Sequence, residues 1–166
     1  MTSTTNFRQN YLTPTNFKFS IQRLPNVSFF CQTVSLPGLS FSPVEIPTPF
    51  KSLYREGGPL DVGTFTVTML VDEDMQNYLE IYNWMIGLTF PESFEEYANL
   101  VGGEGLYSDA SLHIMSNAKN PNVIVKLKDI FPIGVGDINM SVNQTDTTPV
   151  SVDVSFQVNS FTVTAN

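Results

Sequence analysis

Few residues in this sequence could carry out acid–base or nucleophilic chemistry. His113 is the only histidine, and it stands between Leu112 and Ile114. No Gly-x-Ser-x-Gly motif accompanies it, so the nucleophile turn of a serine hydrolase is absent. A single histidine in an apolar stretch is typical of a strand side chain that faces outward or meets an interface. We therefore interpret His113 as structural.

Cys31 is the only cysteine. One cysteine excludes an intrachain disulfide and a cysteine-ligated zinc site. It follows Phe29 and Phe30, and thiols buried in apolar surroundings are inert. We predict that Cys31 is a core residue.

The carboxylates and glycines form no recognisable site either. Asp72–Asp74 resembles the start of a helix, whereas a calcium loop spreads its oxygen ligands over about twelve residues. The acidic residues within Glu92–Glu96 fall in one turn and cannot flank a glycosidic bond. The glycines within Gly102–Gly105 lack the Lys-Ser or Lys-Thr pair of a phosphate-binding loop. The sequence predicts no enzyme, no metal site and no cofactor.

The composition indicates a protein that is covered by other subunits. Charged residues make up 14% of the 166 residues, against roughly 25% in an ordinary soluble domain. Depletion of charge is typical of buried interfaces, although a surface rich in Ser, Thr and Asn would explain it too. The net charge of −8 and the lack of any basic run disfavour tight binding to nucleic acid. The sequence shows no secretory signal and no apolar run of about 20 residues, so we expect no membrane segment and a cytoplasmic location until assembly.

Alternation of apolar and polar residues predicts a mainly β, antiparallel sandwich or partly closed barrel with one flanking helix. The first strand, Phe17–Ile21, is expected to form a hairpin with Val27–Leu36 across a turn at Pro25. A bend is predicted at residues 131–134. The further predicted strands are Thr64–Leu70, Ala110–Ile114, Val123–Leu127, Ile138–Val142 and Val150–Val158.

One clear helix is predicted after the strand Thr64–Leu70. Asp72 is the expected N-cap and Gly87 the expected end. Its apolar stripe, expected to face the core at a spacing of 3.6, comprises Met75, Tyr78, Leu79, Tyr82, Met85 and Ile86. Residues 93–100 are expected to form a short second helix.

Residues 1–14 are predicted to be a flexible arm, and residues 15–166 a single domain interrupted by a long loop at 38–63. The loop contains four prolines, which exclude a central strand. It is nevertheless apolar, so we expect it to lie on another subunit or, alternatively, to fold back over its own domain.

Several segments, in this order and spacing, resemble the tail tube proteins of contractile-tailed bacteriophages of the T-even type. They are Phe29–Gly38, Phe65–Met69 followed by Tyr82-Asn83-Trp84, Val125–Pro132 followed by Val135-Gly136, and Val150–Val158. The resemblance extends from about Asn16 to Val163.

This resemblance implies a β-sandwich whose copies form hexameric rings that stack into a tube within the virion. The implied partners are other copies, the surrounding sheath and the baseplate, and DNA passes through the bore without specific binding. A bore must let DNA slide, so its lining should be polar and poor in cations. The candidates for the lining are Thr64, Thr66, Thr68, Ser151, Asp153, Ser155 and Gln157. The candidates for ring stacking are Phe41, Val44, Ile46, Phe50, Lys51, Leu53 and Arg55.

Two other functions stay open at this point. A virion carbohydrate- or receptor-binding sandwich would be a monomer or trimer with clustered exposed aromatic residues. A baseplate tube initiator would share the tube fold.

Overall fold

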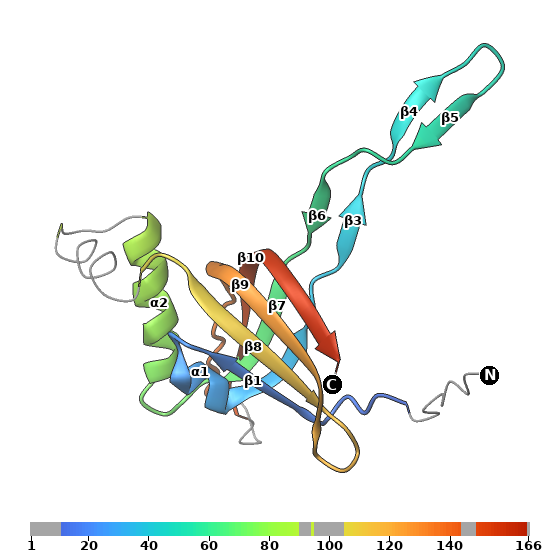
Figure 1. The fold of residues 1–166 in the computed structure, drawn as a ribbon. Coiled ribbons are helices and arrows are strands. Elements are labelled where there is room, and N and C mark those ends of the chain that lie inside the picture. The colour runs from blue at the N-terminus through green and yellow to red at the C-terminus, as the bar shows by residue number, and fades with distance from the viewer. Residues whose placement is uncertain (1–10, 90–93, 95–104, 144–148, 166) are drawn as a thin grey trace.

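The computed structural model describes residues 11–89, 94, 105–143 and 149–165 (Figure 1). Within them lie two helices, α1 (Pro25–Phe30) and α2 (Gln76–Thr89). The strands are β1 (Phe17–Ile21), β2 (Cys31–Ser35), β3 (Leu39–Phe41), β4 (Val44–Pro47), β5 (Ser52–Arg55), β6 (Leu60–Val62), β7 (Phe65–Leu70), β8 (Ser108–Met115), β9 (Pro121–Val135) and β10 (Ser151–Ala165).

Six strands form one antiparallel sheet in the order β1-β8-β9-β10-β7-β2. The sheet curls into a nearly closed barrel, and its two edge strands, β1 and β2, are consecutive in the chain. Helix α1 joins them and contacts both β1 and β7, so it covers the side on which the sheet does not close. The predicted fold class is confirmed.

The predicted hairpin between β1 and β2 is wrong. β1 pairs with β8, where Phe19 lies opposite Leu112, and β2 pairs with β7. The segment between them is helical because Pro25 occupies the first turn, where its missing N–H is not needed. Burial of Val27, which is 0% exposed, holds this short helix against the core.

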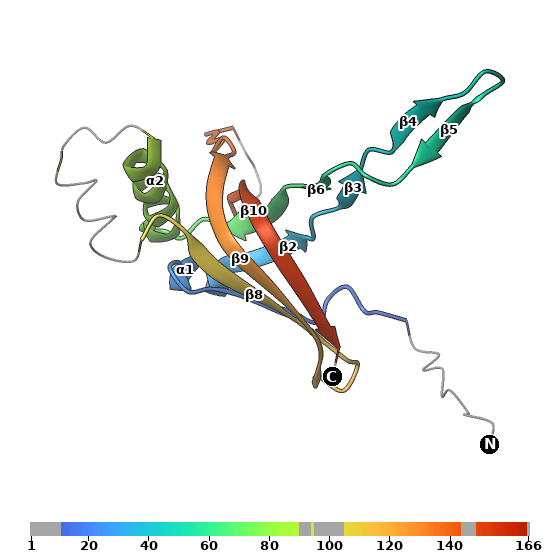
Figure 2. The same cartoon turned by 45° about the horizontal axis from the view of Figure 1, so that its top comes forward.

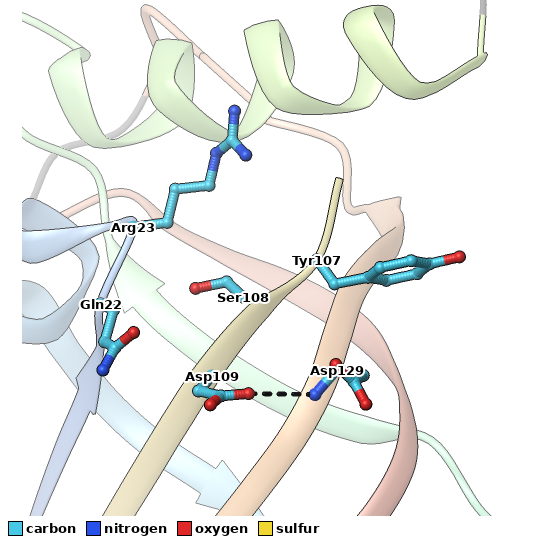
Figure 3. Close-up of a pocket in the computed structure, with 6 residues that line it drawn as sticks. All are labelled: Gln22, Arg23, Tyr107, Ser108, Asp109 and Asp129. Atoms are coloured by element: carbon cyan, nitrogen blue, oxygen red, sulfur yellow. Dashed lines mark hydrogen bonds between the residues drawn. The ribbon is translucent and has the colours of Figure 1, made fainter. Parts of the chain in front are cut away.

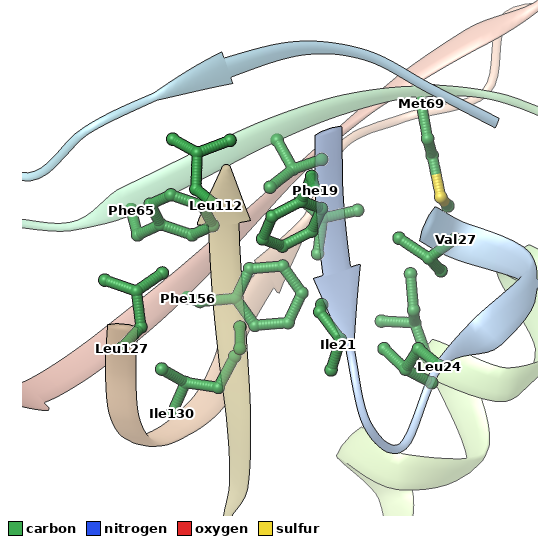
Figure 4. Close-up of a cluster of buried hydrophobic side chains, with 14 of the residues drawn as sticks. Phe19, Ile21, Leu24, Val27, Phe65, Met69, Leu112, Leu127, Ile130 and Phe156 are labelled. Atoms are coloured by element: carbon green, nitrogen blue, oxygen red, sulfur yellow. The ribbon is translucent and has the colours of Figure 1, made fainter. Parts of the chain in front are cut away.

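The core lies on the concave side of the sheet (Figure 4). β7 alternates between buried and partly exposed residues along its whole length, and β10 does the same from Ser151 to Val158, as predicted. Phe65 and Phe156 are paired across these strands with ring centroids 6.4 Å apart. Each strand therefore has one apolar and one polar face, as its period of two dictates.

Helix α2 packs on this core with a different face from the one predicted. Its buried residues are Asn77, Ile81, Trp84 and Gly87, whereas Leu79 and Tyr82 are 42% and 49% exposed. Trp84 decides the orientation, because its ring lies 6.4 Å from that of Phe156 and its Nε1 donates to the Leu106 carbonyl at 3.2 Å.

The start and end of α2 also differ from the prediction. Gly87 is buried within the helix, which continues to Thr89. Asp72 closes a turn before the helix, where its carbonyl accepts from the Met75 N–H at 2.9 Å. The side chain of the buried Asn77, in the first turn of α2, bonds the backbone groups here. Its Nδ2 donates to the Leu70 carbonyl at 2.6 Å, and its Oδ1 accepts from the Asp72 and Tyr78 N–H groups. A polar residue on the core face obscured the apolar stripe in the sequence.

The second half of the chain departs from the prediction in two places. β9 continues through the predicted bend at residues 131–134, which takes the form of a bulge: Ser155 pairs with Gly134 and Phe156 with Pro132, so the register shifts at Ile133. No strand forms at Ile138–Val142. Pairing with β10 ends where the Gly136 N–H donates to the Asp153 carbonyl at 2.7 Å. Beyond that point Ile138 still packs against the core, but Met140 and Val142 are exposed, so the core does not continue along this alternation.

The predicted helix at 93–100 and most of the predicted arm at 1–14 lie outside the described residues. Where the arm meets the domain, Thr13 donates to Asn117 Oδ1 at 2.6 Å and the Asn16 carbonyl accepts from the Met115 N–H. These bonds hold the chain just before β1 to the turn between β8 and β9. Among the described helices, none has the length and apolarity to cross a membrane.

We expect Val154→Asp to destabilise the domain by about 4 kcal/mol or more, because Val154 is 0% exposed and no partner surrounds the new carboxylate. Chemical denaturation followed by circular dichroism measures this loss. Asp153→Asn is the matched control on the opposite face and should cost under about 1 kcal/mol. Equal losses for the two variants would contradict the assigned strand phase.

Candidate assembly surfaces

The segment 38–63 leaves the body as a two-stranded ribbon, which we call the ribbon (Figures 1 and 2). The Gly63 N–H donates to the Gly38 carbonyl at 2.9 Å and joins the two strands at the base. β3 pairs with β6 and β4 pairs with β5, but none of them joins the six-stranded sheet. The ribbon therefore does not fold back over its own domain.

The half of the ribbon nearest the body is amphipathic. Leu39 lies opposite Val62 and Phe41 opposite Leu60, and cross-strand partners share a face. Leu39, Phe41 and Leu60 are 56%, 60% and 62% exposed. The opposite face carries the pair Ser40 and Asp61. One face of the ribbon thus carries exposed apolar side chains in the single chain, although Val62 at its base packs against the core.

The outer half continues this arrangement to the tip. Val44 lies opposite Arg55 and Ile46 opposite Leu53, so these residues share a face. Phe50, at the tip, is fully exposed. All seven predicted stacking residues lie on the ribbon, and together they are Phe41, Val44, Ile46, Phe50, Lys51, Leu53 and Arg55. Sequence reasoning missed Leu39 and Leu60, which only the cross-strand register places beside Phe41.

The two halves of the ribbon meet where its strands approach closely. A Cβ atom on Gly58 would lie 2.0 Å from the Ser42 carbonyl oxygen, so only glycine fits at this position.

The predicted bore residues lie together on the outer side of the sheet, the side turned away from the core. Ser155 pairs with Thr66 and Asp153 with Thr68, whose Oγ1 donates to Asp153 Oδ1 at 2.6 Å. Three predicted bore residues remain. Thr64 lies just before β7, and Ser151 and Gln157 lie on β10. β2 extends this polar face with Thr33 and Ser35, opposite Thr68 and Thr66, and sequence reasoning missed both.

On β9, β8 and β1 the outer side of the sheet carries basic residues as well as hydroxyl groups. Lys126 lies between Thr162 of β10 and Ser111 of β8, and Lys128 lies opposite Ser160. Lys18 of β1 lies opposite His113. The absence of lysine and arginine from the predicted bore residues therefore does not extend over the whole sheet.

A polar depression of about 460 Å³ lies beside α2 (Figure 3). It is lined by Gln22, Arg23, Tyr107, Ser108, Asp109 and Asp129. The Arg23 guanidinium stacks 4.9 Å from the Trp84 ring centroid and donates to the Gly105 carbonyl. Asp109 Oδ1 accepts from the Asp129 N–H at 3.2 Å. These contacts give the two side chains structural roles.

The residues singled out for chemistry are held in structural contacts. His113 Nε2 lies 3.4 Å from the Ser111 hydroxyl. Cys31 is half-buried, with its Sγ 3.7 Å from the Thr33 carbonyl. In the described part of the chain, no three His, Cys, Asp or Glu residues are arranged to hold a metal ion.

No protein-family model matches this chain. It is 28% identical over 121 residues to the tail tube terminator protein of Enterobacteria phage T4. The match covers 69% of this chain and 66% of that protein, so the chain spans slightly less than two thirds of its curated relative.

Two solved structures have the same fold over nearly the whole chain. One is a chain of an extracellular contractile injection system sheath–tube complex in the extended state, with a TM-score of 0.68, 11% identity and complete coverage of both chains. The fold is that of a contractile-system tail tube protein. The other is a chain of the tube-terminating cap of the anti-feeding prophage, with a TM-score of 0.68 and 11% identity over 95% of this chain and 93% of that chain. The predicted resemblance to tail tube proteins is confirmed.

Burial raises the pKa of the Cys31 thiol from 9.0 to about 11. At pH 8 the thiolate, which is the reactive form, should therefore be about 100-fold scarcer in the folded chain than in the unfolded chain. We expect alkylation by iodoacetamide at pH 8 to be slower by at least this factor without denaturant than in guanidinium chloride, as measured by mass spectrometry. Equal rates would show that the thiol is open to solvent.

Proposed function

We propose that this chain is a structural subunit of the tail tube of a contractile-tailed phage, in which copies form rings and the rings stack. The observation that carries this proposal is the set of exposed apolar side chains on one face of the ribbon, Leu39, Phe41 and Leu60. A two-stranded ribbon is only marginally stable by itself in water. A neighbouring copy that covers this face would both order the ribbon and remove its apolar side chains from water.

The energy of such a contact is large enough to hold rings together. Burial of three apolar side chains contributes roughly 5 kcal/mol before the cost of ordering is subtracted. The contact recurs once for every copy in a ring, so six copies would multiply it. Lys51 and Arg55, on the same ribbon, would meet carboxylates of the adjoining ring and set the register.

The bore is proposed to lie against the outer face of β7, β10 and β2. Hydroxyl groups dominate this face, and Asp153 is its charged member. Neutral hydroxyls hydrogen-bond to water without holding phosphate, whereas cations bind phosphate by releasing counterions. DNA could therefore pass without being retained. The partners implied by this role are the surrounding sheath and the baseplate, and the place of action is the virion.

A ring at the end of the tube is the second candidate function. The observation that favours it is the 28% identity to the T4 tail tube terminator protein. An end ring joins the tube through one surface only, so the purified chain would form single rings. A tube subunit would form tubes of variable length, and electron microscopy of the purified protein distinguishes the two. A receptor-binding module would form neither.

We expect Phe41→Ser combined with Leu60→Ser to abolish stacking while the subunit remains folded. These side chains pair across the ribbon and leave no cavity in the body, because both are more than half exposed. Electron microscopy and light scattering should find monomers or single rings with an unchanged far-UV spectrum.

The matched control for this pair is Ser40→Ala combined with Asp61→Ala, which alters the opposite face of the same strands. It should stack like the wild type. Long tubes from the Phe41 and Leu60 double variant would refute the assigned stacking face.

We expect Thr66→Lys combined with Ser155→Lys to leave tubes intact and to slow DNA ejection. The two residues are cross-strand partners on the proposed bore face, so each ring would gain a dense positive lining. Thr66→Gln with Ser155→Gln is the neutral control of similar length. Normal ejection rates from phage carrying the lysine pair would place the bore elsewhere.

A further inference from the structure

The outer side of β1, β8 and β9 carries a concentration of positive charge that the proposed bore does not explain. Lys18, Lys126 and Lys128 all lie there. They are three of the eight lysine and arginine residues in a chain with a net charge of −8. We call the surface formed by these three lysines and His113 the basic face.

The basic face is hollowed and lined by hydrogen-bonding groups. Lys18, Ser20 and His113 line one depression, and Ser111, Lys126 and Lys128 line the next. The Ser20 and Ser111 hydroxyls lie 2.8 Å apart, and Ser111 lies 3.4 Å from His113 Nε2. Ammonium and hydroxyl groups together are donors suited to carboxylate oxygens.

The nearest negative charges sit at one end of this face. Asp109 lines the depression that contains Lys128, and its Oδ1 is occupied by the Asp129 N–H. Among the described residues, no carboxylate lines the depression around Lys18. The face therefore has an excess of positive charge, greatest toward the turn between β8 and β9.

Strand order and register together separate the basic face from the proposed bore residues. In the sequence β1-β8-β9-β10-β7-β2, strand β8 lies three places from β7. In a curled sheet of six strands, that separation directs the outward sides of β8 and β7 in nearly opposite directions. Lys126 and Lys128 lie on β9 beside Thr162 and Ser160, beyond the stretch of β10 that carries the proposed bore residues, so a bore along that stretch leaves the basic face free for a neighbour.

The same chain carries an acidic counterpart, the turn Asp72–Asp74 between β7 and α2. Glu73 and Asp74 are exposed. In both views of the fold, α2 lies on the opposite side of the body from the turn between β8 and β9 (Figures 1 and 2). Lys18 and His113 lie at the end of the basic face next to that turn, and Lys126 and Lys128 lie farther from it along β9. Two complementary surfaces on opposite sides of one subunit are what a head-to-tail ring requires.

We propose that the basic face of one copy binds the acidic turn of the next copy within a ring, an inference that rests on the proposed ring assembly. Exposed ion pairs contribute little affinity, but they select the orientation in which neighbours meet. The contact should therefore determine how the ring closes, whereas the ribbon supplies the apolar contact between rings. It should also weaken with salt.

A charge-exchange experiment tests this contact in the full-length chain. Lys126→Glu with Lys128→Glu, and separately Glu73→Lys with Asp74→Lys, should each reduce the fraction of ring-assembled protein about tenfold at low salt. The four substitutions in one chain should restore rings, as should a mixture of the two double variants. Light scattering and electron microscopy measure assembly, and far-UV circular dichroism checks folding. Asp137→Lys, an exposed charge reversal elsewhere, is the control and should assemble normally.

The outcomes separate this inference from the proposed function. Wild-type chain that forms no ring under any condition overturns both. Wild-type rings with unaffected double variants overturn the contact alone. Loss of rings without restoration by exchange also overturns it, because the lysines would then serve another partner. Normal rings with altered DNA retention would assign the basic face to nucleic acid instead.

Discussion

The structure depends on the pairing of β7 with β10. This one contact places Phe65, Val67 and Met69 beside Val152, Val154 and Phe156 on the core side, where all six are 2% exposed or less. The same register places Thr66 and Thr68 beside Ser155 and Asp153 on the outer side. Because side chains alternate with a period of two, a shift of one residue would exchange the two faces. The burial of the core therefore also determines which groups form the proposed bore.

In contrast to the strands of the core, the ribbon exposes its apolar residues in the single subunit. Its strands pair with each other and with nothing else in the described part of the chain, and of its described apolar residues only Val62, at the base, packs against the core. Such a surface raises the free energy of an isolated subunit and lowers that of an assembly. Gly38 and Gly63 hold the base together, and Gly58 lets the strands approach at the junction of its two halves. These contacts fix the geometry of the ribbon in the single chain, before a neighbouring copy covers it.

The packing of α2 and of the sheet positions one acidic and one basic surface on the subunit. Trp84 and Ile81 tie the helix to the core, which fixes the acidic turn that precedes it. The hydrogen bonds of Asn77 to Leu70 and Asp72 hold this turn at the end of β7. On β8 and β9, burial of Leu112, Val125 and Leu127 directs the neighbouring lysines outward. Apolar burial therefore sets the positions of both charged surfaces.

The sequence by itself determined the mainly β class, the phases of β7 and β10, the limits of the ribbon segment and the resemblance to tail tube proteins. These follow from local alternation, from prolines and from the order of short motifs, which need no knowledge of partners. Tertiary structure decided the rest. Pro25 begins a helix, β1 and β2 occupy opposite edges, and the face of α2 that contains Asn77 and Trp84 is buried. The register across strands also decided that Leu39 and Leu60 join Phe41 and that Lys18, Lys126 and Lys128 share one side of the sheet. These features depend on contacts between residues distant in sequence, and periodicity along a single strand carries no information about which strand lies beside it.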